Sequence, residues 1–373
     1  MEDRHYLAAA IRLGRRHEGL TADNPSVGCL LVRDGRIVGA GVTAPGGRPH
    51  AEVVALERAG ADARGATAYV SLEPCAHHGR SPPCADALIA AGVARVVAAM
   101  RDPFGTVDGR GVARLREAGI TVSVGTLEAE ARDGMRGFLS VVERDRPYVL
   151  LKLAVSQEGW LGRRGERVAI TGPVAARHTH LLRAGADAIL VGLGTVLADD
   201  PSLTCRLPGM FERSPHRYVL DAHLDTPSTA SIVQTAPNVP TTILATNTLH
   251  PEREAALRAA GVRVLAGTTF SDANDSGVRT RVGPDRLMDR MRADGVGVLM
   301  VEGGAAVASS FLAAGLIDEV HLIEGRAIGD DPSTAEPIAS PLRADEVPAR
   351  FGVVRCVTLG RDRLTVLRRN EGI

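Results

Sequence analysis

Hydrophobic positions in the first 146 residues alternate between helical and strand spacing. Tyr6, Ala10 and Leu13 recur every three or four residues, which predicts an amphipathic helix at the start of the chain. Two strand-like runs, at residues 27–33 and 36–42, flank Asp34-Gly35, a dipeptide that favours a two-residue hairpin turn. The pattern then predicts helices at residues 50–60, 84–91 and 112–118 and strands at 66–72, 93–100 and 120–124. Such alternation is typical of an α/β layered domain with crossover connections.

The pattern restarts after the charged, turn-prone residues 143–147, so we place a domain boundary near residue 146. An apolar run at 148–155 predicts the first strand of a second domain, and Pro173, with Thr171 as the expected cap, predicts a helix start. Further strands are expected at residues 186–191, 218–220, 242–245, 262–265 and 297–301 and near 320 and 364, with helices at 251–260, 285–292 and 305–314. Residues 268–283 contain few apolar side chains and are expected to form a mobile loop. The chain is therefore expected to hold two α/β domains, residues 1–146 and 147–373.

Composition and charge exclude several classes of protein. The 373 residues include 44 basic and 44 acidic side chains, and only 3% are aromatic. Zero net charge disfavours a nucleic-acid binder, because such proteins need an excess of positive charge. Apolar stretches are interrupted well before the roughly 18 residues that span a bilayer, and the first residues lack a secretory leader pattern, so we expect a cytoplasmic enzyme without membrane contact. Of the 44 basic residues, 43 are arginine and one, Lys152, is lysine.

One His, one Glu and two Cys follow the order of a zinc deaminase site. His50 and Glu52 lie in His-Ala-Glu, and Cys75 follows Pro74, with Cys84 further on. Three ligands leave a fourth position for water, which is typical of a catalytic zinc site. His50 and Cys84 are each expected to begin a helix, and Glu52, which is not a ligand, is expected to carry protons during catalysis. The alternative, in which His50 only caps a helix and the cysteines are small buried residues, is disfavoured by the joint pattern.

Eight residues separate the two cysteines, where many nucleoside deaminases have two. The longer interval contains His77 and His78, which we expect to face the substrate or solvent instead of the metal. A substrate larger than a plain nucleobase is therefore expected.

The segments Asn24-Pro-x-Val-Gly28 and Pro49-His-Ala-Glu52, together with residues 72–84, resemble the bifunctional riboflavin-biosynthesis deaminase/reductase family over nearly the whole chain. The resemblance implies a cytidine-deaminase-like α/β/α layered domain followed by a dihydrofolate-reductase-like α/β domain. It implies one zinc ion per chain and hydrolytic deamination of 2,5-diamino-6-(5-phosphoribosylamino)pyrimidin-4-one. In that family an Asn at the position of Asn24 binds the pyrimidine, although a turn residue before Pro25 is an equal alternative on sequence alone.

The second domain contains Gly192-Leu-Gly and Glu302-Gly-Gly directly after two predicted strands. Glycines there allow a close approach of a cofactor pyrophosphate to the backbone, but these motifs lack the complete Rossmann pattern. The resemblance implies NADPH-dependent reduction of the ribosyl group of 5-amino-6-(5-phosphoribosylamino)uracil. It places these residues near NADPH: Ala154, Ala169, Thr195, Asp199, Gly303 and Gly304. It places these residues near the substrate: Arg167, Arg183, Leu203, Arg206 and Glu302. Arg183 and Arg206 are expected at the substrate phosphate.

Lys152 lies within an apolar strand, where a lysine is normally an edge or solvent residue. The resemblance places it in the reductase site, and we expect it to orient the opened ribose and assist proton transfer, with Asp199 as the rival acid. The chain departs from many relatives at Gln157-Glu158, Arg167, Ala169 and Ala222, so the contacts there are less well specified. The alternatives are a deaminase with an inactive second domain and, less favoured by the charge and composition, a nucleic-acid deaminase. We also expect a homo-oligomer, either a dimer or a tetramer.

Overall fold

The chain folds into two compact units, Met1–Arg146 and Pro147–Ile373. The computed structural model describes residues 2–77, 82–105, 107–164, 168–246, 250–265, 284–327, 335–345 and 347–370. The division falls between Arg146 and Pro147, beside the boundary expected near residue 146. Among the helices that the structure describes, none is long and apolar enough to cross a membrane.

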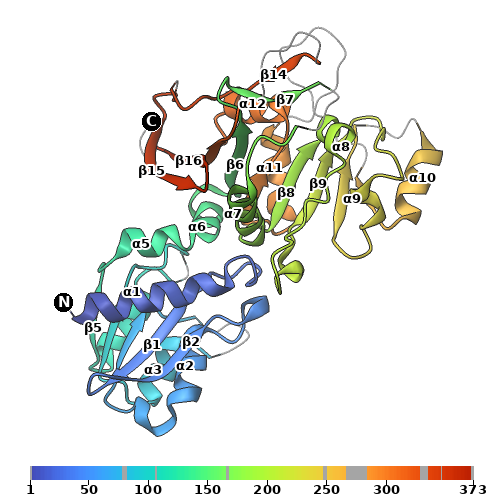
Figure 1. The fold of residues 1–373 in the computed structure, drawn as a ribbon. Helices are drawn as coiled ribbons and strands as arrows, with labels where there is room; N and C mark the ends of the chain where they lie inside the picture. The colour runs from blue at the N-terminus through green and yellow to red at the C-terminus, as the bar shows by residue number, and fades with distance from the viewer. Residues whose placement is uncertain are drawn as a thin grey trace. The chain divides into compact units, whose positions relative to one another are not determined.

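The first unit is built on a five-stranded sheet with the order β2-β1-β3-β4-β5 (Figure 1). Strand β1 is antiparallel to both of its neighbours, whereas β3, β4 and β5 are parallel. The strands are β1 (Gly28–Arg33), β2 (Arg36–Val42), β3 (Thr67–Val70), β4 (Arg95–Ala98) and β5 (Thr121–Val124). The α-helices are α1 (Glu2–Gly14), α2 (Ala51–Ala59), α3 (Cys84–Ala90), α4 (Arg110–Glu117), α5 (Glu128–Asp133) and α6 (Arg136–Arg144).

Two glycines allow helices to approach opposite faces of this sheet closely. A Cβ atom on Gly28 would overlap the backbone of Ala10 in α1. A Cβ atom on Gly41 would overlap the carbonyl oxygen of Ala51 in α2, and Gly41 lies opposite Cys29, one residue along β1 from Gly28. Because successive strand residues face opposite sides, α1 and α2 cover opposite faces. The N-terminus of α2 is thereby fixed against β2.

The second unit contains a nine-stranded sheet with the order β11-β10-β9-β8-β12-β6-β13-β16-β15. Seven neighbouring strands from β11 to β13 are parallel, and β16 is antiparallel to β13 and β15. A separate two-stranded sheet joins β14 to β7. The strands are β6 (Tyr148–Val155), β7 (Trp160–Arg163), β8 (Ala188–Gly192), β9 (His216–Leu220), β10 (Thr241–Leu244), β11 (Arg263–Leu265), β12 (Val298–Val301), β13 (Glu319–Glu324), β14 (Pro337–Ala339), β15 (Phe351–Leu359) and β16 (Asp362–Arg369). The helices are α7 (Pro173–Ala184), α8 (Leu193–Asp199), α9 (Ser231–Gln234), α10 (Pro251–Ala259), α11 (Pro284–Ala293) and α12 (Ala305–Ala313).

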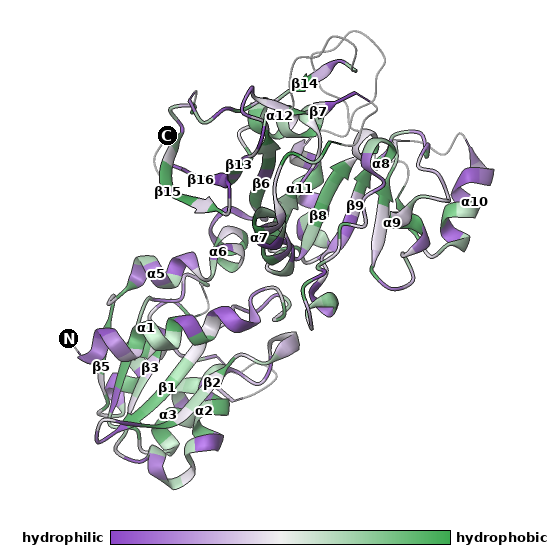
Figure 2. Ribbon diagram, in the orientation of Figure 1, coloured by the Kyte–Doolittle hydropathy of each residue, from purple (hydrophilic) through white to green (hydrophobic). Residues whose placement is uncertain are grey.

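The central strands of the second unit are hydrophobic along most of their length, as Figure 2 shows for β6 and β8, and they bury side chains on both faces. One face of β6 packs Leu151 and Leu153 into a core with α11 and α12. Its other face places Leu150 in a second core with β8, β9, α9 and α10. Lys152 therefore projects from an apolar strand on the same face as Leu150.

The structure confirms most predicted elements and corrects a few. The hairpin around Asp34-Gly35 and the strand at 148–155 have the expected bounds or differ by one residue. The expected Thr171 cap is wrong, because Gly172 is the N-cap of α7 and no side chain caps it. No residue range was predicted for helices α5, α6, α8 and α9 or for strands β7, β14 and β15. The loop expected at 268–283 lies outside the described residues.

Replacing Gly41 by Ala is expected to destabilise the first unit by about 2 kcal/mol or more, because the methyl group overlaps the backbone of α2. Hydrogen exchange at the amides of β1 and β2 measures the loss within this unit. Gly105→Ala is the control, since its Cβ would meet no heavy atom within 4 Å. Equal protection in both variants would contradict the close packing of α2 on β2.

Candidate active sites

Three side chains in the first unit form a candidate metal site. The ligand atoms of His50, Cys75 and Cys84 all lie within 4.8 Å of one another. His50 is the N-cap of α2, and Cys84 begins α3, so both lie at helix N-termini as the sequence predicts. Cys75 lies in the segment after β3, and its Sγ accepts a hydrogen bond of 3.3 Å from the Cys84 backbone N–H. Two helix starts and one loop therefore converge on a single point.

The distances within this cluster fit zinc. Tetrahedral coordination by nitrogen at about 2.1 Å and sulfur at about 2.3 Å separates neighbouring ligand atoms by about 3.6 Å. The Nδ1 atom of His50 lies 3.7 Å from Cys75 Sγ and 3.3 Å from Cys84 Sγ. The Cys84 side chain, the His50 ring and the Cys84 backbone N–H hydrogen-bond to Cys75 and lower its pKa to about 4, against the effect of burial. A thiolate at Cys75 is the form that binds a metal.

Glu52 lies in the first turn of α2, two residues after His50, and its side chain is buried. Burial and the charge of Cys75 raise the pKa of Glu52 to about 7. A carboxyl group with such a pKa can accept and release a proton near neutral pH. The structure thus places a proton carrier beside the metal cluster.

The other residues predicted for this site lie in the surrounding loops. Asn24 packs against Gly47, three residues before His50. His77 is exposed, two residues after Cys75, while His78 lies outside the described residues.

Asp102 is a further residue near this site that was not predicted. It is buried after β4, and burial raises its pKa to about 6, with smaller contributions from the charges of Glu73 and Cys75. Its position at the carboxyl end of a strand, before Pro103, was the available signal.

In the second unit, Lys152, Glu302 and Arg183 form a charged cluster that is largely shielded from water. Val301 of β12 lies opposite Leu151 of β6, so Glu302 and Lys152 come next on two adjacent strands. Lys152 Nζ lies 3.4 Å from Glu302 Oε1, and the Arg183 guanidinium donates to both carboxylate oxygens at 2.9 and 3.0 Å. Burial acts to raise the pKa of Glu302, but the charges of Arg183 and Lys152 lower it to about 2. Glu302 is therefore ionised.

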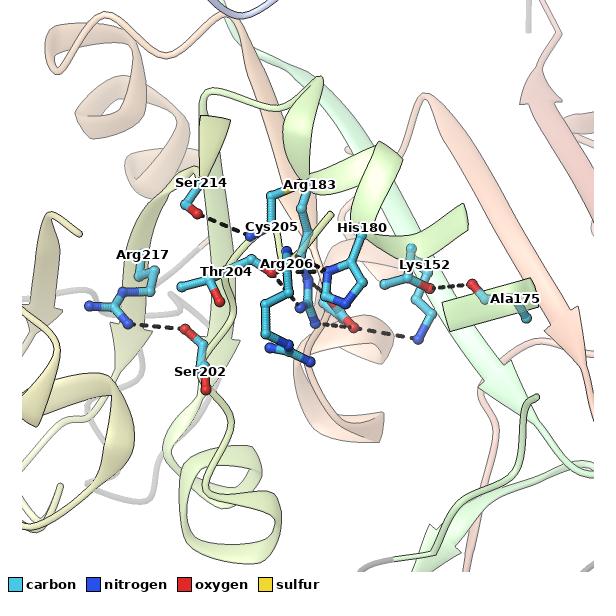
Figure 3. Close-up of polar contacts among 12 residues, drawn as sticks. Lys152, Ala175, His180, Arg183, Ser202, Thr204, Cys205, Arg206, Ser214 and Arg217 are labelled. Carbon is cyan, nitrogen blue, oxygen red and sulfur yellow. Dashed lines mark hydrogen bonds and ion pairs between the residues drawn. The ribbon is translucent and has the colours of Figure 1, made fainter. Parts of the chain in front are cut away.

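The loop after α8 joins this cluster through its backbone. Leu203 is buried and has a φ of 53°, an uncommon conformation for a side-chain-bearing residue. The next residue, Thr204, accepts a hydrogen bond of 3.1 Å from Arg183 through its carbonyl oxygen. Figure 3 shows Arg206 from this loop together with Arg183 and Lys152. The structure thus brings together four of the residues predicted for the substrate: Arg183, Leu203, Arg206 and Glu302.

The predicted cofactor residues occupy the ends of neighbouring parallel strands. Gly192 ends β8 and caps α8, while Gly304 follows β12 and caps α12. These turns lie side by side because β8 pairs with β12, and the Gly304 N–H donates to Thr195 Oγ1 at 3.0 Å. Two adjacent helix N-termini after glycine turns can accept a pyrophosphate.

The remaining residues of the predicted reductase site are more dispersed. Ala154 lies on the same face of β6 as Lys152. Asp199 lies exposed at the end of α8, and Ala169 is exposed, with a carbonyl oxygen that accepts from Arg326 at 2.9 Å. Arg167 lies outside the described residues.

Two known families match different parts of the chain. Residues 1–100 match the cytidine and deoxycytidylate deaminase zinc-binding region, which includes His50, Cys75 and Cys84. Residues 147–336 match the RibD C-terminal domain. These matches confirm the expected succession of a cytidine-deaminase-like domain and a reductase domain.

Related proteins cover almost the entire chain. The riboflavin biosynthesis protein RibD of Escherichia coli is 42% identical over 344 residues, which cover 89% of this chain and 90% of the relative. That of Aquifex aeolicus is 39% identical over 88% of this chain and 90% of the relative. The solved structure of Acinetobacter baumannii RibD, form 2, superposes with a TM-score of 0.81 at 33% identity, covering 99% of both chains. A deaminase/reductase structure from Thermotoga maritima gives a TM-score of 0.83 at 30% identity, again over 99% of both chains.

One unit holds a zinc-type cluster with a buried proton carrier, and the other holds a charged site beside glycine turns. Relatives match nearly the whole length of the chain. The chain therefore belongs to the RibD family of bifunctional deaminase/reductases of riboflavin biosynthesis.

Proposed function

We propose that the first unit deaminates 2,5-diamino-6-(5-phosphoribosylamino)pyrimidin-4-one and that the second reduces the ribosyl group of 5-amino-6-(5-phosphoribosylamino)uracil with NADPH. The Thermotoga maritima relative is described as a diaminohydroxyphosphoribosylaminopyrimidine deaminase and 5-amino-6-(5-phosphoribosylamino)uracil reductase. The observation that carries the proposal is the presence, in one chain, of the His50, Cys75 and Cys84 cluster and of the Lys152 and Glu302 pair. Each of the two activities has its own set of charged groups in its own unit.

In the deaminase unit, His50, Cys75 and Cys84 would hold zinc, which lowers the pKa of water from about 16 toward about 7 when bound. Glu52 is the group that moves protons. Its buried carboxylate accepts a proton from the attacking water and returns it to the departing amino group. Asn24 and His77 are proposed to contact the pyrimidine from the loops on either side.

In the reductase unit, bound NADPH supplies the hydride, and the protein positions the sugar and the phosphates. Glu302 holds the Lys152 ammonium in one orientation, so that this group can hydrogen-bond to the opened ribose and give up a proton. Thr195, Gly303 and Gly304 are proposed to bind the cofactor phosphates. Arg206 is proposed to contact the substrate phosphate. Arg183 donates hydrogen bonds to Glu302, and its positive charge is proposed to attract the phosphate without direct contact.

Two further expectations accompany this function. We propose a cytoplasmic enzyme, because free thiol ligands persist in a reducing compartment and both Cys75 and Cys84 are free thiols. The homo-oligomer, whether dimer or tetramer, stays a prediction.

Replacing Cys75 by Ser is expected to reduce bound zinc from about one ion per chain to well below that and to abolish deamination, because one of three ligands is lost. Metal analysis of the purified protein and an ammonia-release assay measure both effects. Cys356→Ser, at an exposed thiol, is the matched control. Unchanged zinc content and deamination in Cys75→Ser would exclude the proposed metal site.

Replacing Glu52 by Gln is expected to slow deamination about a thousandfold, because the amide cannot carry a proton. Zinc content and reductase activity should stay at the level of the parent protein. Glu57→Gln, on the exposed part of the same helix, is the control. A Glu52→Gln protein that deaminates at the parent rate would assign the proton transfer to another group.

Replacing Lys152 by Arg is expected to lower reductase turnover about a hundredfold, because a guanidinium does not release a proton and the buried site has little room for it. NADPH oxidation on the deaminated compound measures the loss, and hydrogen exchange at the amides of β6 and β12 reports correct folding of the second unit. Full turnover in Lys152→Arg combined with loss in Asp199→Asn would make Asp199 the acid. No NADPH oxidation by the parent protein would indicate that only the deaminase is active.

A further inference from the structure

The loop between α8 and β9 carries Leu203 and Arg206, two of the residues expected at the substrate. Leu203 is buried, with its side chain in the apolar core beside β8 and β9, whereas Arg206 is exposed. The φ of Leu203, 53°, is uncommon for a residue with a bulky side chain. Among the described residues, none forms a hydrogen bond with the Leu203 main chain. Contacts on either side of Leu203 must therefore hold the loop in this conformation.

Arg217, the second residue of β9, is fully buried and holds the loop on one side of Leu203. Its Nη1 donates to the Ser202 carbonyl oxygen at 3.0 Å and to Thr235 Oγ1 at 2.8 Å. Its Nη2 donates to the Val239 carbonyl oxygen at 2.8 Å. Thr235 is the C-cap of α9, and Val239 precedes β10. One guanidinium thus ties the loop to the segment that follows α9.

A second arginine holds the loop on the other side of Leu203. Arg183, in the last turn of α7, donates to the Thr204 carbonyl oxygen at 3.1 Å. In Figure 3, Ser202 and Thr204 lie between Arg217 and Arg183. The main chain is therefore fixed at two points that flank Leu203, which explains how its positive φ is maintained.

The contacts of Arg217 favour a role in positioning over a role in stability. All three of its acceptors are carbonyl or hydroxyl oxygens, and within the described part of the chain its Nε has no partner. Burial lowers the pKa of Arg217 to about 10, so the group is still charged at neutral pH. A buried charge without a counter-charge is unfavourable for folding. What the guanidinium provides is a set of donors that reach separate segments at once.

The groups that Arg217 contacts also border a cavity. Ser202 and Thr235 line a space of about 450 Å³ together with Thr204 and Arg206. A space of this size is within the range of small-molecule sites. A shift of Ser202 would therefore alter both the course of the loop and the wall of the cavity beside Arg206.

Resting on the proposed reductase function, we propose that Arg217 is a positioning residue of the reductase, which holds the Ser202 main chain so that Arg206 meets the substrate phosphate. Arg217 is fully buried and acts only through the loop. Loss of its hydrogen bond to Ser202 should let residues 202–206 move. That movement weakens the contact with the phosphate and leaves the binding of NADPH and the transfer of hydride unchanged.

The first test compares the substrate with the same compound without its phosphate. Arg217→Lys keeps the charge and most of the volume, but its side chain ends one bond earlier and does not reach the Ser202 carbonyl oxygen. We expect the KM for the phosphorylated substrate to rise about tenfold, while kcat, the KM for NADPH and the KM for the unphosphorylated compound stay within about twofold. Arg217→Met, which fills the site without a charge, is the second variant and should give the same pattern.

A structural role alone would give a different result. It lowers the fraction of active enzyme, so kcat falls equally for both compounds and KM does not change. That result, or parent kinetics in the two variants, would overturn the proposal. Thr242→Val is the matched control, because it removes a buried hydrogen bond between β10 and His216 of β9 without touching the loop. Its KM values should equal those of the parent protein.

The second test needs no catalysis. Hydrogen exchange at the Cys205 amide, which donates to Ser214 Oγ at 3.0 Å, reports the order of the loop. We expect Arg217→Lys to accelerate exchange at Cys205 about tenfold or more while the amides of β8 and β12 keep their parent rates. Equal acceleration at all of these amides, or parent exchange at Cys205, would contradict the proposal. If the parent protein oxidises no NADPH, the proposed reductase function fails, and this measurement still decides whether Arg217 orders the loop.

Discussion

The reductase half of the chain depends on one buried carboxylate, Glu302. It lies at the carboxyl end of β12, level with Lys152 on β6, and the guanidinium of Arg183 grips both of its oxygens. A buried ion cluster of this kind contributes little net stability, because desolvation offsets much of the attraction. The cluster instead holds the side chains of Lys152 and Arg183 in fixed orientations. Through Arg183 the carboxylate also fixes the carbonyl oxygen of Thr204, and with it the loop that carries Arg206.

Each site contains an acid that is largely shielded from water, and the two acids act in opposite ways. Burial and the nearby Cys75 raise the pKa of Glu52 to about 7, so this group can exchange protons near neutral pH. Arg183 and Lys152 outweigh the same effect at Glu302 and lower its pKa to about 2, so its charge is permanent. One carboxylate is therefore suited to moving a proton and the other to holding cations in place. The sign of the neighbouring charges, and not burial itself, decides between the two roles.

The sequence predicted what depends on local chemistry. Asp34-Gly35 specifies a hairpin by its backbone preferences, and the apolar run at 148–155 specifies a strand covered on both faces. The order of His50, Cys75 and Cys84 identified a metal cluster because ligand type and spacing are themselves local signals. Helices α5 and α6 were not predicted: α5 is short and carries four charged residues among its six, and α6 ends within the charged segment 143–147 that was expected to interrupt the pattern. The Thr171 cap failed because glycine at position 172 already adopts the extended conformation of an N-cap.

Contacts between distant segments could not be predicted in the same way. The role proposed for Lys152 depends on its contact with Glu302, which is 150 residues away in the sequence. The two residues meet because β12 pairs with β6 so that Val301 lies opposite Leu151. The two histidines of α7, His178 and His180, show the same limit, because helical spacing separates them by about 200° and gives no reason to distinguish them. Only the packed helix does so. One margin of its buried side meets His321 of β13, and the other meets the loop of Thr204 and Arg206. A single helix thereby contacts both strand β13, through His178, and the charged site, through Arg183 in its last turn.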